Sequence, residues 1–318
     1  MKFTGDRELL LVLAGVFALL IVVTVVAVVM ERMVCDGPQR ATVENLLART
    51  RSFWIVTVLG SAALVTGEIG AVALFLLISL LALREFLTLA PTHASDHRSM
   101  VWTFFVVAPL QYALVSIHWY GFYSIMIPVY AFLFIPTLNA MVGDPTRFLE
   151  RTATVQWGLM VCVYSLSYAP ALLWLRIPGF EGEGPKLLLF CVVVAQLSDF
   201  LQYVFGKTLG RHRLAPMISP NKTWEGMVGG VLGATAVGTA LWWATPFPPA
   251  AAAAMAFVIC LMGVAGGLTM SAIKRDRGVK DFGALLAGHG GILDRVDSIC
   301  FSIPVFFHLT RFFFARGS

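Results

Sequence analysis

The chain consists of successive runs of about twenty apolar residues, and these runs constrain its fold more than any other feature. A helix of about this length is needed to cross the hydrocarbon core of a bilayer. Hydrophobic residues make up 58% of the sequence and charged residues only 13%. No polar stretch is long enough to bury a core of its own. The sequence therefore predicts an all-α polytopic protein that forms one integral unit in the lipid bilayer.

The apolar runs predict about nine to ten transmembrane helices, of which the short second one has the weakest signal. The first run is too long and too uniformly apolar for a signal peptide, so we expect it to be retained. A short amphipathic helix over 43–51 could lie on the membrane surface. We divide the chain into N-terminal transmembrane helices (1–150) and a C-terminal catalytic transmembrane region (151–318). The expected helices cover 9–30, 53–67, 69–83, 101–117, 120–142, 153–175, 187–205, 226–246, 249–270 and 297–314.

The basic residues predict the orientation of these helices. If the segment after the first helix is cytoplasmic, all but six of the 23 lysine and arginine residues fall on the cytoplasmic side, as the positive-inside rule requires. Both termini then lie outside, and the loops 206–224 and 272–296 face the cytoplasm, where nucleotides are found. We therefore expect a bacterial inner (cytoplasmic) membrane protein. The net charge of +5 follows from the same bias and does not indicate nucleic-acid binding.

The cysteines indicate neither zinc nor disulfides. There are five of them, and no CxxC or Cys/His spacing occurs among them. Four lie in apolar segments, so we expect buried free thiols. The five are Cys35, Cys162, Cys191, Cys260 and Cys300.

A first polar stretch begins at Asp199, near the cytoplasmic end of an apolar run. Gln196 and Tyr203 stand at helical spacing from it. A carboxylate inside a membrane needs a partner and often marks a functional site. The alternative is an isolated polar residue that reaches the membrane surface or pairs with a nearby arginine.

The sequence Ser-Pro-Asn-Lys-Thr at 219–223 predicts the start of a helix. Ser219 can cap the helix, and Pro220 suits its first position. Free backbone N–H groups at such a start, with basic and hydroxyl side chains, would bind phosphate. A capped helix without a ligand is the alternative, and the three glycines that follow are expected to permit close helix packing. The candidate phosphate ligands are Ser219, Asn221, Lys222 and Thr223.

A second polar stretch, 271–297, carries most of the expected chemistry. Asp294 and Asp297 stand three residues apart and would share one helix face, which suits Mg²⁺, a cation that prefers oxygen ligands and shares itself with phosphates. Lysine and arginine side chains supply the positive charge that phosphates require. A solvated basic loop is the alternative, but it explains neither the four aspartates nor His289 and the paired glycines beside it. We therefore expect this stretch to bind a metal, a nucleotide and a lipid phosphate.

The expected reaction is a nucleotidyl transfer without a nucleophilic triad. Neither Ser271 nor His289 has the partners that a triad requires. A lipid phosphate oxygen can attack the α-phosphate of a nucleotide directly. The metal and the Lys/Arg side chains then neutralise charge as pyrophosphate leaves.

The second stretch resembles the signature of the phosphatidate cytidylyltransferase (CDP-diacylglycerol synthase) family. The matching residues are Ser271-x-x-Lys274-Arg275, Lys280-Asp281 and His289-Gly290-Gly291-x-x-Asp294-Arg295-x-Asp297. The segment SPNKTWEG at 219–226 is also similar to that family, whereas the first 150 residues match only in hydrophobicity. The resemblance implies a polytopic homodimer of phospholipid biosynthesis. This enzyme would make CDP-diacylglycerol and pyrophosphate from CTP and phosphatidic acid, using Mg²⁺ with K⁺ as a second cation.

The resemblance also implies roles for individual residues. Catalytic roles fall on Ser271, Lys274, Arg275, Lys280, Asp281 and His289. Substrate binding falls on Gly290, Gly291 and Arg295, in addition to the four residues of 219–223, and metal binding on Asp199, Asp281, Asp294 and Asp297.

Two positions depart from the family pattern. Ala287 replaces a usual proline, and Gly267 stands where the family commonly carries an aspartate that binds metal. Two alternatives to the synthase therefore stay open. One is a cytidylyltransferase for a different lipid phosphate. The other is a homologue of low or no activity on the same scaffold, such as a transporter, although a transporter would favour repeats and charges near the bilayer midplane.

Overall fold

The computed structural model describes residues 7–33, 67–89, 93–283 and 290–315, together with single positions between 40 and 62. In this part of the chain, eight helical stretches are long and apolar enough to cross a membrane. These helices agree with the predicted all-α membrane protein, apart from one two-stranded hairpin, and the count of nine to ten crossings stays a prediction. The expected helices over 43–51 and 53–67 lie largely outside the described residues.

The N-terminal half contains five of these stretches, and three of them mix α-helical with π-helical turns. The division at residue 150 falls in the first turn of α8 and stays a prediction. The elements are α1 (Arg7–Met33), α3 (Glu68–Thr88), η1 (Ala94–Asp96), α4 (His97–Trp102), η2 (Thr103–Val107), α5 (Ala108–Ser116), α6 (Tyr120–Ile125), η3 (Met126–Ala131), α7 (Phe132–Val142), α8 (Phe148–Gly158), η4 (Leu159–Ser165), α9 (Leu166–Ala171) and η5 (Leu172–Trp174).

The C-terminal half adds longer helices and a small β-hairpin. Its elements are α10 (Gly184–Thr208), β1 (Arg213–Ala215), β2 (Ser219–Thr223), α11 (Trp224–Ala240), η6 (Trp242–Ala244), α12 (Pro249–Asp276) and α13 (Leu293–Phe314). The helix expected over 226–246 therefore ends earlier than predicted, at Ala240.

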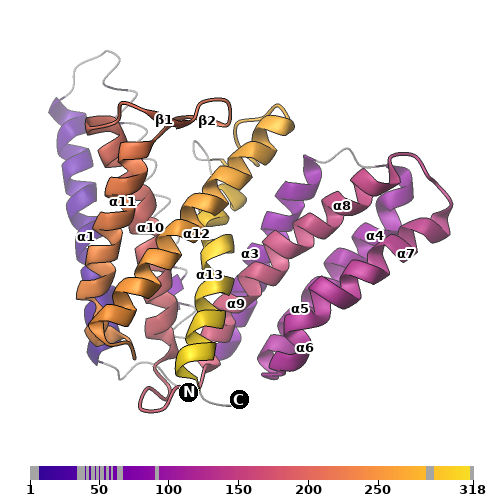
Figure 1. Ribbon diagram of the computed structural model, residues 1–318, viewed down its shortest axis with the longest axis horizontal. Coiled ribbons are helices and arrows are strands. Elements are labelled where there is room, and N and C mark those ends of the chain that lie inside the picture. The colour runs from indigo at the N-terminus through magenta and orange to yellow at the C-terminus, as the bar shows by residue number, and fades with distance from the viewer. Residues whose placement is uncertain are drawn as a thin grey trace.

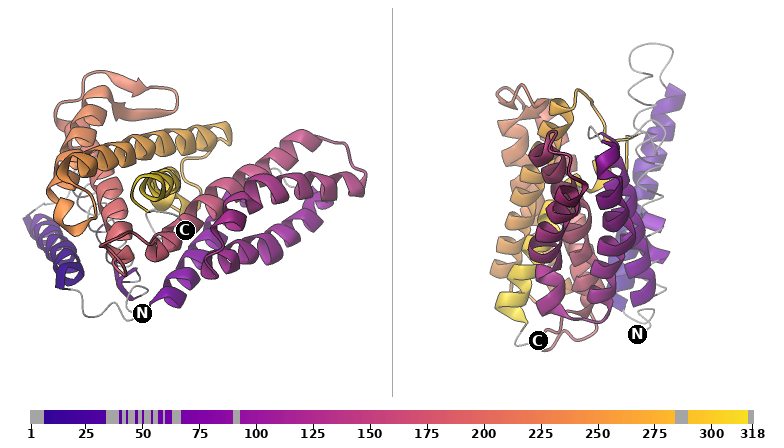
Figure 2. Two further views of the ribbon diagram at one scale, coloured as in Figure 1. Left: turned by 60° about the horizontal axis from the view of Figure 1, so that its bottom comes forward. Right: turned by 90° about the vertical axis from the view of Figure 1, so that its right-hand side faces the viewer.

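Helix α13 lies at the centre of the molecule. It packs against α10 and α12 on one side and against α3 and α9 on the other (Figures 1 and 2). Small residues allow the close approach of α12. A Cβ at Gly266 would lie 2.6 Å from the backbone oxygen of Asp297, and the buried Ser302 hydroxyl donates to the carbonyl of Ile259 at 2.9 Å. The position of α13 thus depends on glycine and serine at its interface with α12.

Glycines also bring α10 and α11 together. A Cβ at Gly226 would lie 2.7 Å from the carbonyl oxygen of Gln202, and one at Gly229 would lie 2.7 Å from the ring of Phe205. Gly230 packs against Gln202 in the same way. The prediction that these three glycines serve helix packing is confirmed.

The segment 219–223 is a strand, so the predicted helix start at Ser219 and Pro220 is wrong. Strand β2 pairs with β1 in antiparallel orientation, with Arg213 opposite Thr223. A proline is tolerated on the open edge of a two-stranded sheet. The cap of α11 is Thr223, whose Oγ1 accepts a hydrogen bond from the Gly226 N–H at 3.1 Å. The backbone pairing of the hairpin moves the helix start four residues along the chain.

The loop expected over 272–296 is shorter in the structure. Helix α12 continues to Asp276 and α13 begins at Leu293. Ser271, Lys274 and Arg275 therefore lie on the last turns of α12, and Asp294 to Asp297 lie on the first turns of α13. Gly278, with φ of 68°, forms the turn after α12, a conformation that favours glycine.

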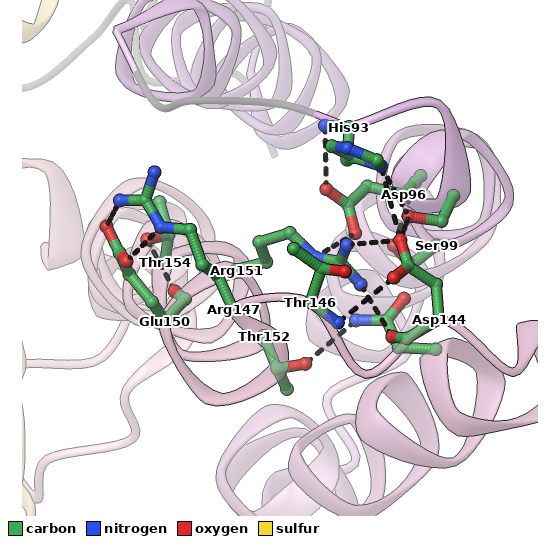
Figure 3. Close-up of polar contacts among 12 residues, drawn as sticks. His93, Asp96, Ser99, Asp144, Thr146, Arg147, Glu150, Arg151, Thr152 and Thr154 are labelled. Atoms are coloured by element: carbon green, nitrogen blue, oxygen red, sulfur yellow. Dashed lines mark hydrogen bonds and ion pairs between the residues drawn. The ribbon is translucent and has the colours of Figure 1, made fainter.

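A polar cluster near the start of α8 joins it to α4 and α7 (Figure 3). Arg151, which is 6% exposed, pairs with Asp96 at 3.1 Å and with Asp144 at 2.7 Å. The Arg151 guanidinium, together with Ser95 and Thr146, lowers the pKa of Asp144 well below its usual range. The sequence places Arg151 in a cytoplasmic loop, but here it is a buried charge that holds three helices together.

The cysteines of the apolar segments behave as expected. Cys162, Cys191, Cys260 and Cys300 are buried free thiols. Cys35 lies outside the described residues.

Both polar stretches lie at one end of the molecule. The hairpin and the end of α12 stand at the top of Figure 1, whereas α1 begins and α13 ends at the bottom. The beginning of α1 and the end of α13 thus lie away from the described parts of the loops 206–224 and 272–296, as expected.

Cysteine labelling can test this arrangement in membranes. With Cys35 replaced by serine, we expect an impermeant maleimide to reach Met217→Cys, at the exposed hairpin turn, and Asp276→Cys from the cytoplasmic side only. Their side chains are exposed in the structure. Glu181→Cys, exposed at the other end before α10, should react only from the opposite side. Labelling of Met217→Cys and Asp276→Cys from different sides would contradict a single site.

Candidate active site

Two carboxylates from different helices meet at Ser298. The Ser298 hydroxyl hydrogen-bonds to Asp199 Oδ2 and lies 3.2 Å from Asp297 Oδ1, which also accepts the Ser298 N–H at 2.8 Å. Asp199 Oδ1 lies 3.4 Å from the side-chain nitrogen of Gln202. Helices α10 and α13 thus bring together two of the four predicted metal ligands.

Lys222 on β2 reaches toward this carboxylate pair. Its Nζ atom occupies the space beside Gly267, because a Cβ there would lie 2.7 Å from it. The ammonium group interacts electrostatically with both Asp199 and Asp297. The place that an aspartate would fill at residue 267 is therefore filled here by a lysine side chain.

Asp294 is held by nitrogen donors. Its Oδ1 pairs with Lys274 Nζ at 2.8 Å, and its Oδ2 accepts the N–H groups of Phe282 at 2.8 Å and Gly291 at 2.9 Å. The Asp294 side chain is only 7% exposed. Asp294 therefore joins the end of α12, the segment after it and the start of α13, while Asp297 on the same helix faces Asp199.

Ser271 and Arg275 contact backbone carbonyls at the end of α12. The Ser271 hydroxyl donates to the Gly267 carbonyl at 2.6 Å. Arg275 donates from Nε to the Ile218 carbonyl at 3.2 Å and from a terminal nitrogen to the Val279 carbonyl at 3.0 Å. Arg275 thereby fastens the hairpin to α12.

The other predicted residues surround this region. Lys280, Asp281 and Asn221 are exposed, and Ser219 and Thr223 lie at the two ends of β2. Gly290 has φ of 76°, and a Cβ on it would lie 2.7 Å from Asp294 Oδ2. Arg295 stands on the first turn of α13. His289 and Ala287 lie outside the described residues.

Asp199 and Asp297 supply carboxylate oxygens, which are the type of ligand that Mg²⁺ prefers. Mg²⁺ is commonly held by one or two carboxylates together with substrate phosphates. Within the described residues, no group of three or more His, Cys, Asp and Glu side chains could hold a metal. The full predicted set of four aspartates is thus not assembled around one point, and the metal assignment stays a prediction.

Glu85 on α3 contacts the same region, although no sequence motif points to it. Its carboxylate accepts the N–H groups of Ile292 at 3.0 Å and Leu293 at 2.9 Å. The only signal in the sequence is an acidic residue within an apolar run, because no motif includes it.

A cavity of about 400 Å³ adjoins the site between α3, α8 and α12. Most of its lining is apolar. The Phe282 ring forms part of the wall, and Lys274 Nζ lies 5.4 Å from the centre of that ring. The polar side chains of the lining are Glu150, Thr154, Thr269, Asp276 and Arg277. An apolar chamber therefore lies next to the Lys274–Asp294 ion pair.

Comparison with known proteins assigns this architecture to a family. The sequence matches the model of the cytidylyltransferase family over residues 47–313. The chain belongs to this family. The resemblance that residues 271–297 indicate is thereby confirmed, and membership makes the protein a nucleotidyltransferase.

The relatives fall into two groups by the share of each chain that the match covers. A protein of Escherichia coli K12 named "uncharacterized protein YnbB" is 37% identical over 304 residues, which is 94% of this chain and 97% of that protein. The phosphatidate cytidylyltransferases of Staphylococcus saprophyticus and Mycobacterium leprae are each 38% identical, over 146 and 164 residues. These matches cover 45% and 51% of this chain and 56% and 50% of the two enzymes.

Replacement of Asp294 should lower the stability of the fold. We expect Asp294→Ala to reduce the free energy of unfolding by about 3 kcal/mol, because it leaves the Lys274 charge and two backbone N–H groups without their acceptor. The matched control, Asp276→Ala, removes an exposed carboxylate and should cost less than about 0.5 kcal/mol. Unfolding midpoints of the purified variants in mild detergent measure both. Equal unfolding midpoints for Asp294→Ala and Asp276→Ala would show that Asp294 does not stabilise the segment between α12 and α13.

Proposed function

We propose that the protein transfers a cytidylyl group from CTP to phosphatidic acid and releases CDP-diacylglycerol and pyrophosphate. The observation that carries this proposal is the partly buried pair Asp199–Asp297, with Lys222 beside it, at one end of a bundle of membrane helices. The named relatives act on phosphatidate, which supports the choice of lipid. The positive-inside count supports a position of this end of the bundle at the cytoplasmic face of a bacterial inner membrane.

The arrangement of charge supports two phosphate-bearing substrates. Lys222 lies at the carboxylate pair, and the exposed Lys280 lies on the segment after α12. The apolar cavity beside Lys274 offers a place for acyl chains next to this polar region. A water-soluble nucleotide and a lipid phosphate could therefore reach the same point from the cytoplasm and from the bilayer.

In the proposed reaction, an anionic oxygen of the lipid phosphate attacks the α-phosphorus of CTP. The bond from that phosphorus to the bridging oxygen of the β-phosphate breaks, and pyrophosphate leaves with the electron pair. The attacking oxygen carries no proton, so no general base is needed. Asp199 and Asp297 would hold Mg²⁺, which supplies positive charge to the phosphates. Lys222 and Lys280 bind and orient the phosphate groups through their ammonium charges.

A different lipid phosphate is the second candidate substrate. The relative that matches this chain along nearly its full length is not described as a phosphatidate enzyme. The named enzymes match over about half of their length. The dimer and the second cation that the resemblance implies also stay predictions.

A transfer assay on the purified protein tests the reaction. We would incubate it with α-³²P-labelled CTP, Mg²⁺ and one of three lipids: phosphatidic acid, lysophosphatidic acid or an isoprenoid phosphate. Label should enter the lipid fraction with phosphatidic acid at least tenfold faster than with the others. Faster transfer to another lipid would support the second candidate, and no transfer to any of them would contradict both.

The carboxylate pair should be needed for turnover and not for folding. We expect Asp199→Asn and Asp297→Asn each to lower kcat at least about 100-fold, since each removes a carboxylate proposed to hold the Mg²⁺ that offsets the phosphate charge. An amide keeps the shape of the side chain and removes a like charge from its neighbour, so the unfolding midpoint should stay the same or rise. Glu181→Gln, at an exposed carboxylate at the other end of the molecule, is the control. Turnover within threefold of the unchanged protein in both variants would contradict the metal assignment.

A further inference from the structure

Glu85 joins α3 to the start of α13 across 207 residues of sequence. It is 6% exposed, and its two oxygens accept separate backbone hydrogen bonds, from Ile292 to Oε1 and from Leu293 to Oε2. Ile292 is the N-cap residue of α13 and makes no side-chain capping bond of its own. The capping acceptor of this central helix therefore comes from a different helix.

A carboxylate is well suited to this place. The first N–H groups of a helix have no partner within the helix, and the helix dipole places partial positive charge there. Inside a membrane, an N–H group without an acceptor is costly. Glu85 satisfies two of these N–H groups, and the same contacts stabilise its own buried charge.

Two glycines between α12 and α13 make room for the Glu85 side chain. A Cβ at Gly283 would lie 2.8 Å from Glu85 Cδ, and a Cβ at Gly291 would overlap the Glu85 carboxylate. The next residue of α3, Phe86, stacks on Phe282 with ring centres 6.2 Å apart. The last turns of α3 thus contact both described ends of the segment between α12 and α13.

We infer that Glu85 is a positioning residue for the cytidylyl transfer. By fixing the backbone at 291–293, it sets where α13 begins, and so where Asp294 meets Lys274 and where Asp297 meets Asp199. Glu85 acts through these residues, because its own oxygens are bonded to the backbone. This inference rests on the proposed function for its effect on turnover, and on the structure alone for its effect on α13.

The first test compares the kinetics of Glu85 variants. Glu85→Ala should lower kcat at least tenfold and leave the KM for CTP within threefold, because folded enzyme still binds nucleotide but holds Asp297 less firmly. Glu85→Gln should recover part of kcat, since its amide oxygen can accept one of the two N–H groups. Glu68→Ala, at the other end of α3, is the matched control. A Glu85→Ala enzyme with unchanged kcat per folded molecule would overturn the inference.

The second test asks whether Glu85 and Gly291 act together. Gly291→Ala should lower kcat because the added methyl group displaces the Glu85 carboxylate. In the Glu85→Ala background, the loss of kcat caused by Gly291→Ala should be at least fivefold smaller, because the obstructing carboxylate is gone. If the double variant loses kcat by the product of the two single losses, to within twofold, the two residues act independently and the inference is contradicted.

The third test does not depend on activity. Hydrogen exchange of a peptide covering 290–300 should be faster in Glu85→Ala than in the unchanged protein or in Glu68→Ala, since two amides lose their acceptor. If the unchanged protein transfers no cytidylyl group to any lipid phosphate, the proposed function fails, and exchange still decides whether Glu85 holds α13. If the protein is active and exchange is the same in all three, the inference on Glu85 fails and the proposed function stands.

Discussion

The hydrogen bonds at the first turns of α13 are the contacts on which the rest of the site depends. Three helices converge there: α3 brings the Glu85 carboxylate, α12 brings Lys274, and α10 brings Asp199. In a low-dielectric surrounding, polar groups are stable only when each finds a partner. The glycines and serines along α12 and α13 serve the same end, because they let the helices approach closely enough for these short side chains to meet.

Much of this fold could be predicted from the sequence, because the signal for a membrane helix is local. The run 120–142 has the bounds that the structure shows, and those signature residues that the structure describes lie at the carboxylate pair or around it. What the sequence could not supply is pairing across long distances. A spacing of three places Asp294 and Asp297 on one helix face, but it does not show that Asp294 contacts Lys274 and that Asp297 faces Asp199. Glu85 was missed for the same reason.

Local signals also failed where tertiary contacts compete with them. Ser219 and Pro220 have the chemistry of a helix start, but pairing with β1 makes them a strand. Arg151 follows the positive-inside rule in sequence, but the structure buries it against Asp96 and Asp144. Gly267 appeared as a missing carboxylate, whereas its lack of a side chain leaves space for the ammonium group of Lys222.

The central place of α13 has a consequence for biogenesis. Ribosomal synthesis delivers α13 after all the other described helices, so α3, α10 and α12 enter the bilayer before their common partner exists. Until then Glu85, Asp199 and Lys274 are polar groups in an incomplete bundle, a costly state in lipid. Insertion of one helix satisfies all three together. A chain that stops before α13 therefore leaves these three groups without the partners that α13 supplies.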